Sequence, residues 1–146
     1  EGGKSTNSDI IFRATSDCPF IYWEGIDNLI QKHVSGKYDF SIYDKLPLGS
    51  FYEVINLESL IISHEKGKKK HRSELCSLYI NEHKNKFKIN RILPSKNLRR
   101  PELRLTVDSP EDLILARIIH KKFGGIIKPI SLEKISPNPS LELQDE

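Results

Sequence analysis

The chain has 146 residues, of which 37% are hydrophobic and 29% are charged, so it can bury a core and form one domain. Its formal net charge of +3 and isoelectric point near 8.8 suit a phosphate-bearing ligand, but they are too weakly basic to indicate a nucleic-acid-binding protein. Cys18 and Cys76 form no disulfide framework or zinc-site spacing, so a reducing cytoplasm is the expected location. No apolar run approaches the roughly 18 residues of a membrane helix, and we expect a soluble protein.

The first patterned segment runs from Asp9 to Pro19. Its apolar residues at 10–12 predict a strand, and a polar loop containing Asp17 follows them. Because proline stops further strand pairing, Asp17 is expected close to the end of this strand.

Amphipathic helices and short strands are predicted along the middle of the chain. The strands are expected at 38–42, 51–55 and 87–92, with Asn56 capping the helix that follows the second of them. The helices, with the residues expected to face inward, are 24–34 (Ile26, Leu29, Ile30, Val34), 57–65 (Leu57, Leu60, Ile61) and 73–83 (Leu75, Leu78, Tyr79). His64 shares the helical spacing of 57–65 and is either a ligand or a half-buried surface histidine. A chain that alternates strands with such helices is typical of an α/β sandwich.

The segment 66–72, Lys-Gly-Lys-Lys-Lys-His-Arg, is a dense run of cations. Clustered cations can pair with a triphosphate or a sugar carboxylate, and they can bind nucleic acid non-specifically or simply form a solvated loop. Because the run contains no interleaved aromatic residues, we expect no specific nucleic-acid binding.

The segment 103–113 joins a strand pattern to a helix start. Leu103, Leu105 and Val107 alternate with polar residues, and Ser109-Pro110-Glu111-Asp112 supplies an N-cap, a proline at the first helical position and acids in the first turn. The predicted helix covers 110–123, with Leu113, Ala116, Ile119 and Phe123 inward. Asp108 lies at the junction, where an α/β sheet presents ligand-binding residues. It is therefore either a metal ligand or a second capping group.

Two segments together resemble a known family. Arg-Ala-Thr-Ser-Asp-Cys-Pro at 13–19 and Leu-Arg-Leu-Thr-Val-Asp-Ser-Pro-Glu-Asp-Leu at 103–113 are similar, in this order, to two late motifs of the cytidylyltransferase family. This family includes the spore-coat polysaccharide type and is related to the synthetases of CMP-activated sugar acids. The resemblance runs from about Asp9 to about Gly124.

A third segment, Gly49-Ser50-Phe51-Tyr52-Glu53-Val54, resembles the sugar-side motif of this family. Gly49, Glu53 and Val54 match the motif, whereas Phe51 replaces its usual first acid. A fourth segment, 73–80, keeps Glu74, Tyr79 and Ile80 but has Leu75 and Leu78 in place of a histidine and a proline.

The resemblance implies a glycosyltransferase type A-like, Rossmann-related three-layer α/β sandwich with a mixed, mostly parallel sheet. We expect a single domain over 1–146 that corresponds to the C-terminal half of the family domain, with a flexible tail at 136–146. The triphosphate loop of the family has no counterpart in the chain. There is also no methionine, even at position 1, which indicates a fragment or a sequence from which residues are missing.

The resemblance also implies an enzyme. The family transfers CMP from CTP to a sugar or sugar acid, here for cell-surface polysaccharide synthesis, with Mg²⁺ as cofactor. Asp17 and Asp108 are the implied catalytic and metal-binding residues, and Arg13 and Glu53 the candidate substrate-binding residues. We expect CTP and a sugar or sugar acid as partners, expect no membrane partner, and leave a homodimer open. The alternative is a non-catalytic binding or assembly module, favoured by the altered residues Phe51, Leu75 and Leu78 and by the missing front half.

Overall fold

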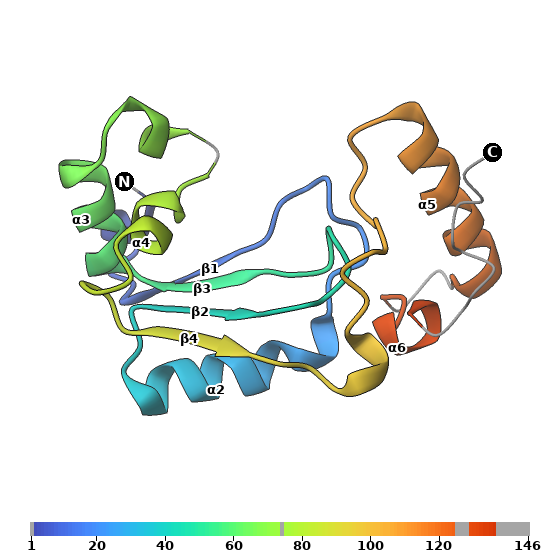
Figure 1. Ribbon diagram of the computed structural model, residues 1–146, viewed down its shortest axis with the longest axis horizontal. Coiled ribbons are helices and arrows are strands. Elements are labelled where there is room, and N and C mark those ends of the chain that lie inside the picture. The colour runs from blue at the N-terminus through green and yellow to red at the C-terminus, as the bar shows by residue number, and fades with distance from the viewer. Residues whose placement is uncertain (1, 74, 125–128, 137–146) are drawn as a thin grey trace. The chain divides into compact units, whose positions relative to one another are not determined.

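The computed structural model describes residues 2–73, 75–124 and 129–136 (Figure 1). The helices in these ranges are α1 (Gly2–Ser5), α2 (Ile26–Gly36), α3 (Leu57–Lys66), α4 (Leu78–Glu82), α5 (Pro110–Phe123) and α6 (Leu132–Ile135). The strands are β1 (Ile10–Arg13), β2 (Phe40–Tyr43), β3 (Glu53–Asn56) and β4 (Ile89–Ile92). Short 3₁₀ helices cover Trp23–Gly25, Lys69–Arg72 and Lys96–Leu98. No helix in the described ranges is long and apolar enough to cross a membrane.

The chain divides into two compact units. Unit 1 takes its residues from 1–13, 28–42 and 53–91, and unit 2 takes them from 14–27, 43–52 and 92–146. The expectation of a single domain over 1–146 stays a prediction.

The strands form a sheet in the order β1-β3-β2-β4 (Figure 1). Both β1 and β2 pair with β3 in antiparallel register. The hydrogen bonds from Asp39 N to Lys88 O and from Asp44 N to Ile92 O advance in the same direction along β2 and β4, so this pair is parallel. The sheet is therefore mixed, as expected, but the prediction that it is mostly parallel is wrong.

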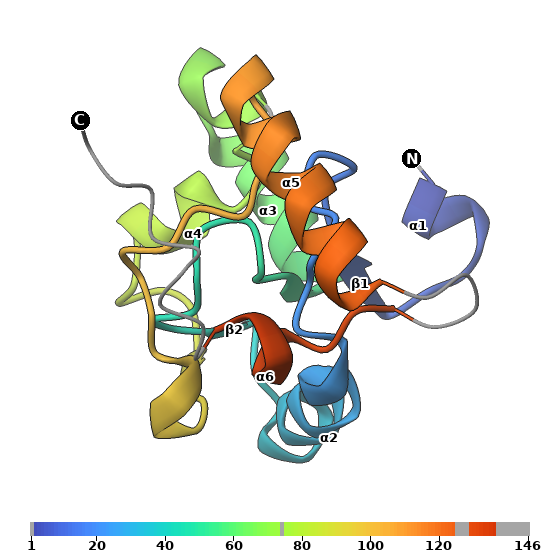
Figure 2. The same ribbon diagram turned by 90° about the vertical axis from the view of Figure 1, so that its right-hand side faces the viewer.

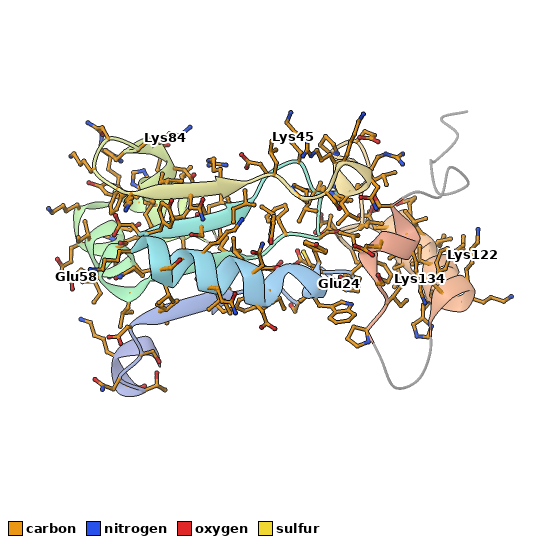
Figure 3. The ribbon with its side chains drawn as sticks, turned by 90° about the horizontal axis from the view of Figure 1, so that it is seen from below. Glu24, Lys45, Glu58, Lys84, Lys122 and Lys134 are labelled. Atoms are coloured by element: carbon orange, nitrogen blue, oxygen red, sulfur yellow. The ribbon has the colours of Figure 1, made fainter. Side chains whose placement is uncertain are left out.

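Helix α2 covers one face of the sheet (Figure 3). Its buried residues are Leu29 and His33, which are one helical turn apart. The imidazole Nδ1 of His33 lies 2.9 Å from the hydroxyl of Ser41 on β2, so a polar contact attaches the helix to the sheet. Val34, expected inward, is 53% exposed. Its place in the pattern is taken by the preceding histidine, whose polar atom has a partner on the strand.

The core of unit 1 comprises Phe40, Ile55, Tyr79, Ile80 and Phe87. Helix α3 begins as predicted, because the side-chain oxygen of Asn56 accepts a hydrogen bond of 2.9 Å from the backbone N–H of Glu58. Helix α4 is much shorter than the helix expected at 73–83, and Leu75 is 56% exposed. Glu74, one of the residues that match the family, lies outside the described residues.

Helix α5 in unit 2 has the predicted bounds, Pro110 to Phe123. The hydroxyl of Ser109 accepts from the backbone N–H of Asp112, and the carboxylate of Asp112 accepts from the backbone N–H of Ser109. Asp112 and Ile119 are the buried residues of the helix, whereas Leu113, expected inward, is 40% exposed. Helices α5 and α6 are neighbours in unit 2, and Figure 3 marks Lys122 and Lys134 on them (Figures 2 and 3).

The segment 103–107 is extended, but it is not the regular strand that its alternating pattern predicted. It contributes one isolated parallel bridge, between Leu48 and Arg104. Leu48 N donates to Leu103 O at 2.9 Å and Leu105 N donates to Leu48 O at 2.7 Å, so the segment follows the turn around residue 48. The tail expected at 136–146 lies, apart from Ser136, outside the described residues. Ser136 itself is fully buried, so the expected tail does not begin there.

Candidate functional site

Asp17 lies in the loop that follows β1. The strand ends at Arg13, so Asp17 is four residues beyond it and not directly at the strand end. Its backbone carbonyl accepts a hydrogen bond of 2.8 Å from Val107 N and one of 3.4 Å from the Thr106 hydroxyl. These contacts hold the Asp17 loop beside the segment that leads to Asp108, and both belong to unit 2.

Asp17 and Asp108 lie on either side of the Thr106 hydroxyl, which is 3.4 Å from the backbone carbonyl of Asp17 and 3.4 Å from Oδ1 of Asp108. The pKa of Asp17 is lowered from its ordinary value, mainly by a hydrogen bond from the Thr15 side chain, while desolvation acts in the opposite direction. Hydrogen bonds involving Cys18 and Asp108 lower this pKa further. Two adjacent carboxylates repel unless cations or hydrogen-bond donors offset their charge, so this is a place where a cation would be stabilised.

Arg104 supplies a positive charge beside Asp108. Its Nη2 donates to Asp108 Oδ2 at 2.6 Å and to Asp112 Oδ2 at 2.9 Å, and its Nε donates to Asp112 Oδ1 at 2.8 Å. The guanidinium lowers the pKa of Asp112 well below its usual range, with help from hydrogen bonds donated by the backbone of Asp108 and Ser109. Asp112 is therefore a charged structural anchor for the start of α5.

The Asp108 carboxylate has two different sides. Its Oδ2 faces the guanidinium of Arg104, and its Oδ1 is 3.4 Å from the hydroxyl of Thr106. Its side chain is 50% exposed, compared with 7% for the Asp112 side chain. Asp108 is thus more accessible than Asp112. Asp17 and Asp108 together are the two carboxylates that could hold a metal.

This pair fits the chemistry of Mg²⁺. Across the described part of the chain, no cluster of three or more His, Cys, Asp or Glu side chains could hold a metal ion. Mg²⁺ does not need such a cluster, because it is commonly held by one or two carboxylates together with substrate phosphates and water. The Asp17 and Asp108 pair therefore suits an ion that arrives with a nucleotide better than it suits a permanently bound structural metal.

Arg13 and Glu53 lie in unit 1 and contact each other. They are directly opposite in the β1–β3 register, and Arg13 Nη1 donates to Glu53 Oε2 at 2.9 Å. The other oxygen of Glu53 accepts a short hydrogen bond from the Ser77 hydroxyl. The Glu53 side chain is only 8% exposed, so this carboxylate serves internal contacts in the structure. Its expected role in substrate binding stays a prediction, as does that of Arg13.

Three aromatic residues of unit 2 differ in their surroundings. Tyr22 packs edge-on against Tyr43, with ring centroids 5.3 Å apart. Trp23 is 41% exposed and Phe51 is 36% exposed. Tyr22 is thus a packing residue, and Trp23 is the more accessible ring in this part of unit 2.

Sequence reasoning missed Arg104, Asp112 and Thr15. Arg104 and Asp108 are four residues apart, and Asp112 occupies the third helical position after the Ser109 cap, which is the position that reaches back to the cap. Those spacings were visible in the sequence, but the sharing of one arginine by two acids depends on how the chain bends between them.

The fold and the acid pair describe an α/β protein with a site suited to a metal-bound phosphate ligand. A family model described as cytidylyltransferase matches residues 3–135, so the chain belongs to the cytidylyltransferase family. This match covers nearly the whole chain and does not support the finer expectation that the chain corresponds to a C-terminal half.

Individual relatives agree with this membership. The chain is 30% identical over 122 residues to the spore coat polysaccharide biosynthesis protein SpsF of Bacillus subtilis, a match that covers 83% of the chain and 51% of that protein. It is 28% identical over 141 residues to an uncharacterized protein of Methanocaldococcus jannaschii, covering 95% of the chain and 58% of that protein. The chain thus spans about half the length of these curated relatives.

A solved structure is also similar. The structure of a cytidylyltransferase from Leptospira borgpetersenii matches 99% of the chain and 63% of its own length, with a TM-score of 0.83 and 25% sequence identity. The α/β fold with its mixed sheet is therefore a cytidylyltransferase fold.

Proposed function

We propose that the complete protein is a CTP-dependent cytidylyltransferase that activates a sugar or sugar acid. In this reaction an acceptor hydroxyl oxygen forms a bond to the α-phosphorus of CTP, the bond between that phosphorus and the bridging oxygen to pyrophosphate breaks, and the hydroxyl proton passes to solvent. The products are a CMP-sugar and pyrophosphate. Membership of the family supports the nucleotide, and the name of the Bacillus subtilis relative supports a sugar acceptor used in polysaccharide synthesis.

The observation that carries the proposal is the proximity of Asp17 and Asp108. Both residues belong to unit 2, and hydrogen bonds from Val107 N and the Thr106 hydroxyl to the backbone carbonyl of Asp17 hold the Asp17 loop beside the segment that leads to Asp108. In the proposed site they bind Mg²⁺, which would neutralise negative charge on the phosphate oxygens of CTP. The two acids and Thr106 contribute by holding their positions, because transfer of this kind depends on positioning and charge stabilisation more than on covalent help from the protein.

Arg13 and Glu53 are proposed to act on the acceptor side, in keeping with the sugar-side motif. Glu53 is already bound to Arg13 and Ser77, so we assign to Glu53 the role of orienting the guanidinium of Arg13. The side chain of Arg13 is 30% exposed. Arg13 would then be the residue of the pair that contacts the substrate.

The second candidate is a non-catalytic module that keeps the fold. The engagement of Glu53 in internal contacts favours it, because the one acid that matches the sugar-side motif then has a structural use. The two candidates differ in a simple measurement, the release of pyrophosphate from CTP by the complete protein in the presence of Mg²⁺ and a panel of sugars and sugar acids.

Replacement of Asp108 by Asn tests the proposed site directly. Asn retains the size of the side chain but lacks the charge, so we expect calorimetry to show a loss of Mg²⁺-dependent CTP binding of at least about tenfold while the unfolding temperature holds or rises. The matched control is Glu111→Gln, which alters an exposed acid two residues into the same helix start region. Undiminished Mg²⁺-dependent binding in the Asp108 variant would leave this residue as a part of the helix start only.

A further inference from the structure

The side chain of Arg104 donates hydrogen bonds to two acids, Asp112 and the site residue Asp108. Two of its three hydrogen bonds to carboxylates go to Asp112, one from Nε and one from Nη2. Asp112 is in turn fixed by the backbone N–H groups of Asp108 and Ser109, both at 3.0 Å from its Oδ2. The guanidinium is planar and its donors form a rigid fork, so contact with both oxygens of Asp112 also sets the plane of the group.

This arrangement decides how Asp108 can turn. The Nη2 atom that binds Asp112 also donates to Asp108 Oδ2 at 2.6 Å, which leaves Oδ1 directed to the side of Thr106. The same Thr106 hydroxyl lies 3.4 Å from the backbone carbonyl of Asp17, so Oδ1 of Asp108 is on the side of the Asp17 loop. Without Arg104, a side chain that is 50% exposed would be free to rotate about its χ angles, and either oxygen could face solvent.

We propose, on the basis of the proposed function, that Arg104 is a positioning residue for the metal site. Arg104 binds Oδ2 of Asp108 and thereby leaves Oδ1 on the side of the Asp17 loop. Its positive charge also offsets the repulsion between Asp17 and Asp108 before a cation binds. Asp112 acts one step further out, because it orients Arg104. A single buried acid at the start of α5 thereby caps the helix and arranges the site.

Two effects of Arg104 on a cation have opposite signs, and this makes the proposal testable. As a nearby positive charge, Arg104 weakens cation binding, so charge alone predicts that Arg104→Met binds metal more tightly and that Arg104→Lys binds it as the wild type does. As a positioning residue, it strengthens binding, so both variants should bind more weakly. Lysine retains the charge but has a single ammonium group that cannot contact both oxygens of Asp112 while it holds Asp108.

The experiment is a titration of the complete protein with Mn²⁺ in the presence of CTP, in which the free ion is measured by electron paramagnetic resonance. We expect Arg104→Lys and Arg104→Met to weaken binding about tenfold or more, as is common when a group that orients a metal ligand is removed. Asp112→Asn should weaken it in the same direction, because its loss of charge loosens Arg104. The matched control is Arg117→Lys, the same replacement at an exposed position on α5, which should leave the affinity unchanged. Thermal unfolding of each variant shows that it is folded.

The outcomes separate this inference from the function on which it rests. Binding by the wild type that is lost in Asp108→Asn but unchanged or tighter in both Arg104 variants would overturn the role of Arg104 and leave the metal site standing. Wild-type binding that is equally strong in Asp108→Asn would overturn the site itself, and the inference with it. Absence of Mn²⁺ binding by the wild type would do the same.

Discussion

Gly49 gives the sharpest test of how the chain positions Thr106 and Asp108. Its φ angle is +86°, a left-handed conformation that favours glycine. It also lies against the backbone of 105–106, because a Cβ built on it would be 2.4 Å from Thr106 N and 2.8 Å from Leu105 C. Both atoms belong to the main chain, so no side chain can rotate away to make room.

The cost of Gly49→Ala follows from these two features. A left-handed conformation costs a residue with a Cβ about 1–2 kcal/mol, and an inserted methyl group that forces a backbone shift costs roughly 1–3 kcal/mol. The free energy of unfolding should therefore fall by about 2–5 kcal/mol. Because the shift moves Thr106, we also expect weaker Mg²⁺-dependent CTP binding by the variant at temperatures where it is fully folded.

Urea unfolding followed by circular dichroism measures the first quantity, with unchanged m-values showing that the two states are still comparable. The control is Gly2→Ala, because a Cβ at Gly2 would have no atom within 4 Å. A loss below about 0.5 kcal/mol in the Gly49 variant, equal to the control, would show that the backbone of 105–106 can yield freely. The close approach would then not be what positions the site.

Two further predictions concern unit 1. Burial lowers the pKa of His33 below its ordinary value of 6.5, so the unfolded chain binds a proton at this residue more readily than the folded chain does. The stability that depends on neutral His33 is therefore present above pH 6.5 and is lost as the pH falls towards the lowered pKa. Urea unfolding at several pH values should show this loss in the wild type and a smaller loss in His33→Asn, and identical pH dependences would contradict it. Glu53→Gln leaves Arg13 without its buried counter-charge and should lower the free energy of unfolding by about 1–3 kcal/mol, whereas the exposed control Glu58→Gln should change it by less than about 0.5 kcal/mol. An unchanged free energy of unfolding in Glu53→Gln would mean that solvent replaces the ion pair between Arg13 and Glu53.

Helix α5 could be predicted from the sequence to its first and last residues, because its signals are local. Ser109 caps the first turn, Pro110 fits the first helical position, and Gly124 follows the last residue, so each end is determined by residues within one turn of it. The same holds for the start of α3 at Asn56.

The strand pattern at 103–107 shows where such local reasoning ends. Alternation reports that Leu103 and Leu105 are buried, and they are 6% and 4% exposed. It cannot report whether a neighbouring strand continues beside them, and here the pairing stops after a single bridge to Leu48. The directions of the paired strands also depend on connections far apart in the sequence, which is why the mostly parallel sheet was wrongly predicted.

Inward-facing positions were wrong where a polar residue is buried with a partner. Periodicity placed Val34 and Leu113 inside, but the side chains of these two residues are exposed. The neighbouring residues His33 and Asp112 are buried instead. A hydrogen bond to Ser41 and the fork of Arg104 make these burials favourable. Hydrophobicity alone does not contain that information, so the part of the site built by Arg104 and Asp112 was not predictable from the pattern.

The different surroundings of the two acids bound to Arg104 suggest how one short segment can serve both folding and binding. Asp112 accepts hydrogen bonds from two backbone N–H groups and from two nitrogens of the arginine, and its side chain is 7% exposed, so a ligand could reach it only by breaking the helix start. Asp108 has one hydrogen bond to the same arginine and a longer contact of 3.4 Å to the Thr106 hydroxyl, and its side chain is 50% exposed, so an incoming cation can reach it without breaking the helix start. The buried carboxylate of Asp112 therefore stabilises the helix start, and the exposed carboxylate of Asp108, four residues before it, is accessible to a ligand. Replacing either acid should affect mainly the property to which it is assigned, with Arg104 as the residue that couples them.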